Sequence, residues 1–123
     1  MRSRGFTLIE LMVVLAVLAL LVSYVAPRYF SVVSKAEEAA LRHNLFQMRD
    51  AIDKFYSDRG RYPNELKELT SERYLRAIPT DPFTGRSDTW VIVAPAAGVG
   101  GRVFDVKSGS TAQAADNSRF STW

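Results

Sequence analysis

One carboxylate stands at the beginning of the longest apolar run in this chain. Glu10 directly precedes Leu11 to Val22, a run that contains no charged residue. An ionised acid near the middle of a membrane helix costs on the order of 2.5 to 3.5 kcal/mol on insertion scales, and an acid kept there usually serves a function. We therefore expect Glu10 to pair with a positively charged group.

The residues before Glu10 suggest how such a group could form. Hydrolysis of the peptide bond between Gly5 and Phe6 would remove Arg2 and Arg4 and leave a new ammonium group on Phe6, four residues before Glu10. This amine could pair with Glu10 of a neighbouring copy of the chain. The unpaired N–H groups and the positive dipole end of a helix N-terminus also stabilise a nearby anion.

The segment Gly5-Phe6-Thr7-Leu8-Ile9-Glu10-Leu11, behind a short basic leader and ahead of an apolar helix, resembles the class III signal of type IV pilins and type II secretion pseudopilins. The resemblance implies that residues 1–5 are a leader and that a prepilin peptidase cleaves after Gly5. It also implies that Phe6 becomes N-methylated and that Glu10 serves assembly of a homo-oligomeric helical fibre, with the apolar helices packed inside.

Two other interpretations of the N-terminus explain its residues less well. An ordinary secretory signal peptide would need small residues at its cleavage site, and the candidate site lies near Ala26. Tyr24 occupies a position where a small residue is required, and Pro27 follows Ala26 directly. Residues 6–26 are expected to form the transmembrane and assembly helix. A plain single-span anchor with no role in a fibre is the other interpretation, since the twenty residues 6–25 suffice to span a bilayer, but it leaves Glu10 unexplained.

Pro27 is expected to disturb the helix, because proline removes one backbone hydrogen bond and clashes with the preceding turn. A kink or a locally melted stretch around residues 23–27 is therefore predicted. It could be a simple kink at the membrane boundary, or the bending and unwinding inside a fibre that the resemblance implies.

The charge balance predicts membrane topology rather than nucleic-acid binding, since Arg2 and Arg4 contribute two of the net charges in the formal total of +3. Basic residues on the short N-terminal side predict a cytoplasmic N-terminus in the bacterial inner membrane, with the remainder of this single-pass chain in the periplasm. The chain has no cysteine. Its globular domain, expected at residues 27–123, must then be stabilised by packing or by a metal.

The expected fold class is α+β and pilin-like, with a long N-terminal helix, first transmembrane and then amphipathic, packed on a small antiparallel sheet. The amphipathic helix is expected at residues 28–57, because its apolar residues recur at spacings of three and four. These stripe residues are Leu41, Leu45, Met48, Ile52 and Phe55. An αβ loop at 58–88 and a sheet with a C-terminal loop at 89–123 are expected to follow.

Within the loop, Gly60 is expected to end the long helix and Asn64 to cap a short one at residues 65–69. The stretch Phe55-Tyr56…Gly60-Arg61-Tyr62-Pro63, followed by Tyr74-Leu75…Ile78-Pro79…Asp81-Pro82, resembles the αβ loop of the G-type pseudopilins of type II secretion. Strands are predicted at 89–94 and 102–107. The tail at 120–123 adds a third strand or packs an aromatic ring against the sheet.

A candidate metal site lies in the polar C-terminal loop. Asp105, Ser108 and Asp116 offer oxygen atoms of the kind that calcium binds, although calcium prefers six to eight of them. G-type pseudopilins carry a calcium loop in this region, but residues 108–111 replace the acid- and glycine-rich segment of the family. Calcium and an ordinary polar loop both remain open, and Arg119 could take over a cation's bridging role.

The residues favour a structural role over an enzymatic one. The only histidine, His43, lies among charged residues and is expected to be solvated, and the sequence has no phosphate loop or zinc pattern. The resemblance implies a subunit of a periplasmic type II secretion pseudopilus, with prepilin peptidase, minor pseudopilins and an inner-membrane assembly platform as partners. The alternative is a type IV pilin or minor pilin in adhesion, motility or DNA uptake.

Overall fold

The computed structural model describes residues 4–123, so Arg2 and most of the expected leader lie outside the described residues. The chain divides into two compact units, one ending at Lys35 and one running from Ala36 to Trp123. Helix α1 (Leu8–Arg59) contributes to both units. The second unit also holds α2 (Leu66–Ser71), the strands β1 (Val91–Val93) and β2 (Asp105–Lys107), and the short 3-10 helix η1 (Phe120–Thr122).

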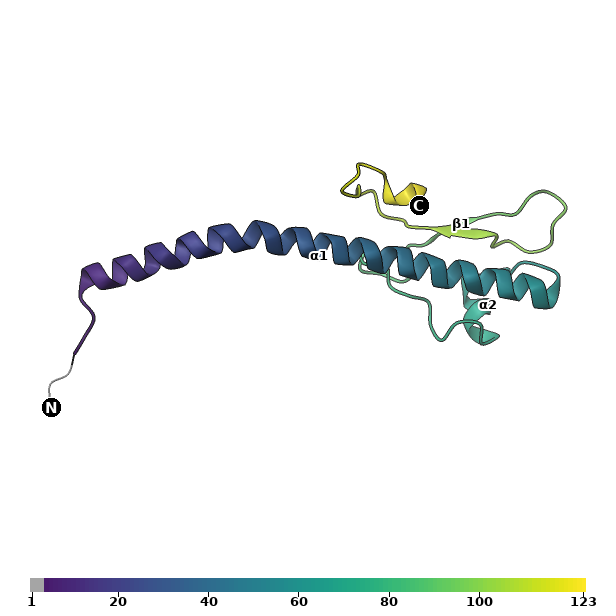
Figure 1. Cartoon of the computed structure of the whole chain (residues 1–123). Helices are drawn as coiled ribbons and strands as arrows, with labels where there is room; N and C mark the ends of the chain where they lie inside the picture. Colours follow the sequence, from purple (N-terminus) through teal and green to yellow (C-terminus); the bar gives the residue numbers. More distant parts are fainter. Residues whose placement is uncertain (1–3) are drawn as a thin grey trace. The chain divides into compact units, whose positions relative to one another are not determined.

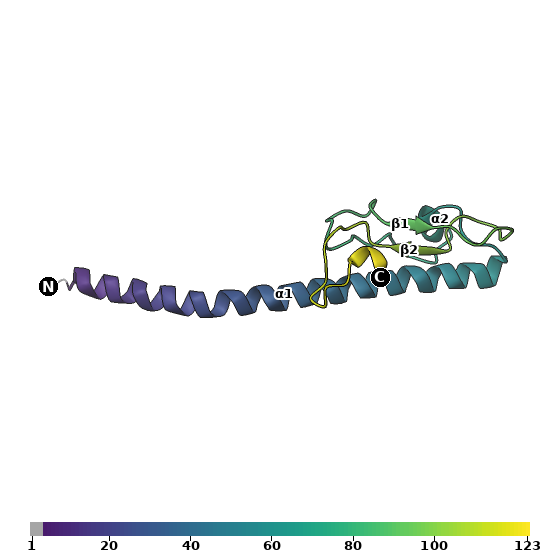
Figure 2. The ribbon, with the colours of Figure 1, turned by 90° about the horizontal axis from the view of Figure 1, so that it is seen from above.

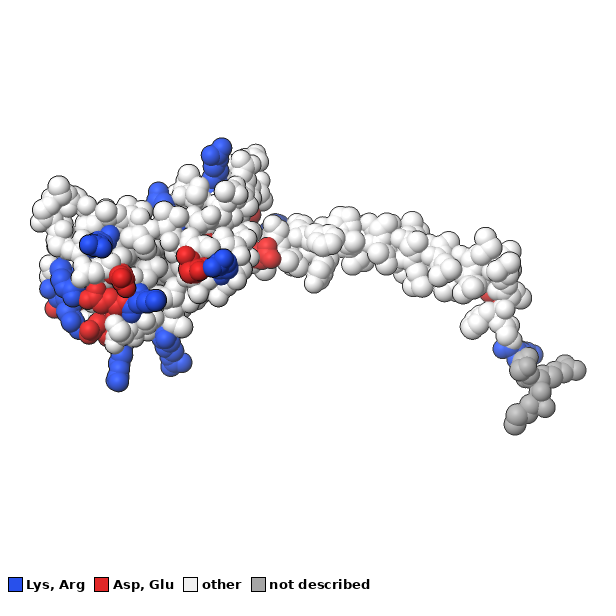
Figure 3. Space-filling view, turned by 180° about the vertical axis from the view of Figure 1, so that it is seen from behind, with Lys and Arg blue, Asp and Glu red and all other residues white. Residues whose placement is uncertain are grey.

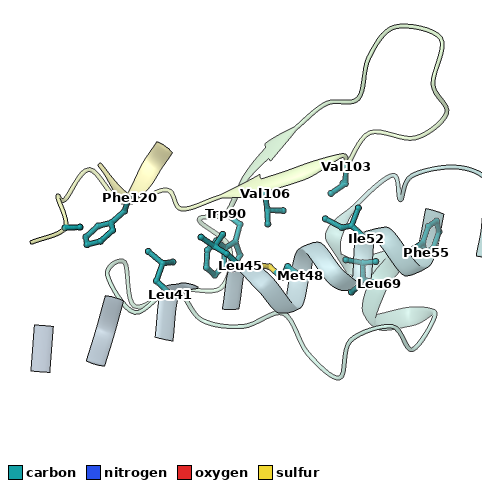
Figure 4. Packing of buried hydrophobic residues seen from close by; sticks show 12 residues of the cluster. Leu41, Leu45, Met48, Ile52, Phe55, Leu69, Trp90, Val103, Val106 and Phe120 are labelled. Atoms are coloured by element: carbon teal, nitrogen blue, oxygen red, sulfur yellow. The ribbon is translucent and has the colours of Figure 1, made fainter. Parts of the chain in front are cut away.

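The core of the second unit forms around the C-terminal part of α1, beside which β1 and α2 lie (Figures 1 and 2). The stripe residues predicted for this helix are all buried, and each is at most 2% exposed. They cluster with apolar side chains from α2, the hairpin and the C-terminal segment (Figure 4): Leu69, Trp90, Val103, Val106, Ala114 and Phe120. Full burial of each large aliphatic or aromatic side chain contributes about 1.5 to 3 kcal/mol. The prediction of an α+β fold is therefore confirmed.

The antiparallel sheet is shorter than the sequence predicts. β1 pairs with β2 in a register that places Val91 opposite Lys107 and Ile92 opposite Val106. The predicted strand at 102–107 begins only at Asp105, because the N–H groups of Arg102 and Val103 donate to the carbonyl of Pro63 and not to β1. The αβ loop thus takes the hydrogen bonds that would have extended the hairpin.

The cap predicted for the short helix was wrong. Glu65, not Asn64, stands at the N-cap of α2, and it makes no side-chain cap hydrogen bond. The Asn64 N–H instead donates to Glu68 Oε2 at 2.7 Å, while the Arg61 guanidinium donates to Glu68 Oε1 at 2.6 Å. The hydrogen bond from Arg61, followed by that from Asn64, lowers the pKa of the Glu68 carboxyl.

The C-terminal tail packs by its aromatic rings and does not add a third strand. Phe120 is 1% exposed and stacks on Phe83 with ring centroids 3.9 Å apart, and Trp123 meets Phe120 edge-on. Residues 120–122 form η1. Phe120 also belongs to the buried cluster that contains Val106 of β2, in agreement with the second alternative for the tail.

A buried carboxylate that the sequence did not single out organises the connector before β1. Asp81 is 0% exposed. Its Oδ2 accepts a hydrogen bond from the Ser108 hydroxyl, and its Oδ1 accepts one from the Phe83 N–H at 2.9 Å. The Ser108 hydroxyl in turn accepts from the Ser110 N–H at 3.1 Å. Asp81 therefore joins the αβ connector to the C-terminal loop.

Replacing Asp81 by alanine should lower the free energy of unfolding by about 2 to 4 kcal/mol, because the Ser108 hydroxyl and the Phe83 N–H lose a buried, charged acceptor. Chemical unfolding of the detergent-solubilised protein, followed by fluorescence of buried Trp90, measures this change. The control is Asp88→Ala, which breaks an ion pair with Arg86 whose side chains are 62% and 68% exposed. It should change stability by less than about 1 kcal/mol. Equal effects of the two substitutions would contradict the prediction.

Candidate functional site

Thr7 and Glu10 form a reciprocal cap at the start of α1. The Thr7 N–H donates to Glu10 Oε2 at 2.8 Å, and the Glu10 N–H donates to Thr7 Oγ1 at 3.2 Å. This is a capping box, in which a threonine before the helix and a glutamate three residues later satisfy N–H groups that have no partner within the helix. The positive end of the helix dipole favours an anion in the same turn.

This local partner was not among the predictions from the sequence, although the Thr-x-x-Glu spacing signals it. Donation by the Thr7 N–H offsets part of the cost of placing the Glu10 carboxylate at the head of an apolar helix. Pairing of Glu10 with the Phe6 ammonium of a neighbouring copy stays a prediction. In Glu10→Gln the cap would be kept while the negative charge is removed, so this substitution can separate the two roles of Glu10.

The expected cleavage site is open to an enzyme. Gly5 and Phe6 lie in irregular chain before α1, and Phe6 is 88% exposed. A Cβ atom added at Gly5 would meet no atom within 4 Å. Substitutions at Gly5 therefore leave the chain's own structure unchanged.

The first unit presents an apolar surface that its own chain does not cover. α1 contains an 18-residue window with a mean hydropathy of 2.7, and 0% of that window is buried. Exposed fractions are 50% at Leu11, 71% at Leu20 and 57% at Val25. Figure 3 shows the charged atoms gathered on the second unit and almost none over this segment. The helix is long and apolar enough to cross a membrane.

Pro27 lies inside α1, which is helical without interruption from Leu8 to Arg59. The locally melted stretch predicted at residues 23–27 is therefore not seen. Proline removes only one N–H donor, and the residues on both sides keep their helical conformation. Unwinding at Pro27 within a fibre stays a prediction.

The three candidate metal ligands do not form a cation site. Asp105 Oδ1 pairs with Arg49 Nε at 2.7 Å, and the Ser108 hydroxyl donates to Asp81. Asp116 Oδ1 accepts hydrogen bonds from both the side chain and the N–H of Ser118, at 2.6 and 3.0 Å. These bonds, led by that of the Ser118 hydroxyl, lower the pKa of Asp116. Each candidate ligand is thus engaged with a different partner.

Within residues 4–123, no group of three or more histidine, aspartate or glutamate side chains is placed so that it could hold a metal ion. The donor set therefore does not fit the calcium loop that the family resemblance implies. Arg119, the proposed substitute for a cation, has its main chain in a bridge with Gln113. His43 is exposed, as the sequence predicts.

One comparison with known proteins concerns the N-terminal segment. A family described as the prokaryotic N-terminal methylation motif matches residues 1–26. This range includes the expected cleavage site, the capping box and most of the exposed apolar segment.

Curated relatives extend the similarity beyond this segment. The chain is 36% identical over 98 residues to the type II secretion system core protein G of Klebsiella pneumoniae. The aligned residues cover 67% of this chain and 70% of the relative. The chain is 30% identical to the protein of the same name from Pectobacterium carotovorum subsp. carotovorum, of which the chain spans 63%.

The similarity to a pilin is narrower. The type IV major pilin protein PilA of Myxococcus xanthus (strain DK1622) is 32% identical over 68 residues, which is 55% of this chain and 31% of the pilin. No solved structure matches the chain.

The apolar segment of α1 and these relatives agree on a single-pass membrane anchor. The similarity to the Klebsiella protein extends over more than two thirds of that relative and includes residues outside the methylation motif. With the α+β fold, these findings show that the chain belongs to the type II secretion system core protein G family, the G-type pseudopilins.

Proposed function

We propose that this pseudopilin is a structural subunit of the periplasmic pseudopilus of a type II protein secretion system. A prepilin peptidase cleaves it between Gly5 and Phe6, and the new N-terminus of Phe6 is methylated. Sister chains then pack their apolar helices into a helical fibre, and growth of the fibre drives protein export. The role is mechanical rather than enzymatic.

The observation that carries the proposal is the uncovered apolar segment of α1 with an acid at its head. Exposure of such a surface to water costs about 25 cal/mol per Å². Lipid covers it in the separate subunit, and neighbouring helices cover it in a fibre. Aliphatic side chains pack about equally well against lipid tails and against other helices, so the same surface serves both states.

Glu10 and Phe6 account for the switch between these two states. In the separate chain, the carboxylate of Glu10 accepts a hydrogen bond from the Thr7 N–H. In the fibre, the ammonium of Phe6 from an adjacent subunit lies beside Glu10 and forms an ion pair in a medium of low dielectric constant. The pair specifies the axial register of two otherwise featureless apolar helices.

The proposal includes an orientation and a set of partners. Arg2 and Arg4 hold the N-terminus in the cytoplasm, so residues 36–123 lie in the periplasm. Prepilin peptidase, the minor pseudopilins and an inner-membrane assembly platform act on the chain in turn.

A type IV pilin role in adhesion, motility or DNA uptake is the second candidate, favoured by the similarity to PilA. That similarity covers 31% of the pilin, whereas 70% of the Klebsiella core protein G is covered. Electron microscopy of cells that overproduce the chain, with genetic removal of either the secretion or the motility assembly proteins, separates the two roles. Loss of the fibres only when the secretion proteins are removed supports the pseudopilus.

Replacing Gly5 by leucine is expected to abolish removal of the leader. A peptidase that cleaves after Gly5 must approach the main chain there, and a branched side chain blocks that approach. Mass spectrometry of the membrane-extracted protein measures the result: the wild type loses residues 1–5 and gains a methyl group, whereas the variant keeps its full mass.

The matched control is Gly5→Ala, which adds one carbon atom where the chain leaves open space. Partial processing of this variant is expected. Complete loss of the leader from Gly5→Leu would refute the proposed cleavage site, because neither substitution disturbs the fold.

A further inference from the structure

One arginine side chain joins three segments of the second unit that lie far apart in the sequence. Arg49, on α1, donates from Nε to Asp105 Oδ1 at 2.7 Å. Its Nη2 donates to the main-chain oxygen of Val106 at 3.0 Å and to that of Trp123 at 2.6 Å. The guanidinium thus binds oxygen atoms from β2 and from the C-terminal segment, and the side chain is 35% exposed.

The neighbouring side chains support the same arrangement. The Asp105 carboxylate also accepts from the Val106 N–H at 2.8 Å, so it is held in place for Arg49. The Arg42 guanidinium lies 4.2 Å from the centre of the Trp123 ring, and the indole N–H of Trp123 donates to the Ser118 hydroxyl. Trp123 is therefore fixed by its ring as well as by its main chain.

Two further hydrogen bonds fix the segment between β2 and Trp123. Ser108 bonds to the buried carboxylate of Asp81, and the Ala115 N–H donates to Glu38 Oε1 at 2.8 Å. Both contacts join the C-terminal segment to other parts of the second unit.

We propose that the Arg49 guanidinium takes the structural place of a bound calcium ion in this pseudopilin, and that the C-terminal segment of residues 108–123 is ordered without any divalent cation. A calcium ion in a loop neutralises carboxylates and gathers main-chain oxygens from separate segments. Arg49 does both, because its planar fork presents several N–H donors and a delocalised positive charge.

The hydrogen bonds of Asp105, one of the candidate calcium ligands, also support this proposal. Asp105 is the first residue of β2, and its Oδ1 already accepts hydrogen bonds from Arg49 and from the Val106 N–H. A calcium ion at this carboxylate would be placed against a fixed positive charge, which Coulomb repulsion disfavours. The three oxygens bound by Arg49 are also fewer than the six to eight that calcium prefers.

The first test uses the full-length wild-type protein in detergent and needs no substitution. Thermal unfolding is followed by tryptophan fluorescence in excess EGTA and in millimolar calcium. The midpoint temperatures should agree within about 1 °C, because a ligand that does not bind the native state cannot stabilise it. A rise of several degrees in calcium would overturn the proposal.

The second test removes the guanidinium. Arg49→Met should lower the midpoint by roughly 5 to 10 °C and speed tryptic cleavage after Arg119, whether calcium is present or not. Arg49→Lys keeps the charge but not the fork, so it should give an intermediate midpoint. The matched control is Lys54→Met, which removes a charge from the same helix. Lys54 pairs with Asp50 one turn away, and its substitution should leave both readings near wild type.

Two outcomes of the second test would refute the proposal. One is a midpoint for Arg49→Met equal to that of the Lys54→Met control. The other is cleavage after Arg119 that EGTA accelerates in the wild type. The EGTA arm remains decisive even if Arg49→Met fails to fold.

Discussion

Replacing Glu10 by glutamine is expected to abolish fibre assembly while the chain is still cleaved, methylated and inserted in the membrane. The substitution removes the negative charge that the Phe6 ammonium of a neighbouring subunit needs. Loss of one partner of a buried ion pair costs about 3 to 5 kcal/mol. At each contact between subunits this is more than a hundredfold in the association constant, and a fibre repeats the contact along its whole length.

Glutamine is the informative substitution because it separates charge from helix capping. In Glu10→Gln the amide oxygen of the new side chain would still accept from the Thr7 N–H, since glutamine serves at this position of a capping box. Glu10→Val removes both the charge and the cap. Equal loss of fibres in the two variants is expected, because the charge rather than the cap is required for assembly.

The matched control removes the cap and keeps the charge. In Thr7→Val the hydroxyl that accepts from the Glu10 N–H is lost, and the helix end is destabilised by about 1 kcal/mol. Fibres should still form in this variant. Electron microscopy counts the fibres, and N-terminal mass spectrometry verifies that each variant matures. Normal fibres from Glu10→Gln would refute the role of the Glu10 charge in assembly. Loss of fibres in Thr7→Val alone would show that assembly depends on the helix cap.

Replacing Gly101 by alanine is expected to lower the free energy of unfolding of the second unit by more than about 4 kcal/mol, among the largest effects of single substitutions. Gly101 has a φ of 95°, and a Cβ atom added there would lie 2.1 Å from the carbonyl oxygen of Tyr62. This oxygen belongs to a main chain fixed on both sides. The Tyr62 N–H donates to Gly100, and the Pro63 carbonyl accepts from Arg102 and Val103. The backbone cannot move aside without breaking these bonds.

Gly98→Ala is the control for backbone strain. Gly98 also has a positive φ, of 88°, but a Cβ atom there would meet no atom within 4 Å. Its substitution should cost about 1 to 3 kcal/mol from strain alone. Chemical unfolding followed by Trp90 fluorescence compares the two variants. Equal destabilisation would show that the crossing of residues 61–63 and 100–103 is looser than the structure has it.

The N-terminal half of the function could be predicted from the sequence because its signals are local. The cleavage site, Glu10 and the apolar run lie within about one membrane-spanning length of chain, and the stripe from Leu41 to Phe55 follows the helical period. Both patterns depend on spacing along the chain alone. The Thr7 cap had the same kind of local signal and was overlooked.

The polar contacts of the second unit could not be predicted in this way. Ser108 and Asp81 are 27 positions apart, and Arg49 is 56 positions from Asp105 and 74 from Trp123. Several acids and serines stand near the C-terminus, and spacing does not indicate which of them faces which donor. The calcium hypothesis grouped Asp105, Ser108 and Asp116 by proximity in sequence, whereas the fold gives each a separate partner.

By itself, the sequence determined an apolar helix with an acid at its head and an amphipathic helix that covers a small sheet, and it predicted the cleavage site. Only the tertiary structure decided how the C-terminal segment is held, where the strands end and that Asp81 is buried. The physical reason is the range of the interactions. Helix periodicity and capping act over three to four residues. The partners of Arg49 and Asp81 are distant in sequence and are brought together by the tertiary fold, in which the αβ loop also accepts the hydrogen bonds of residues 102 and 103.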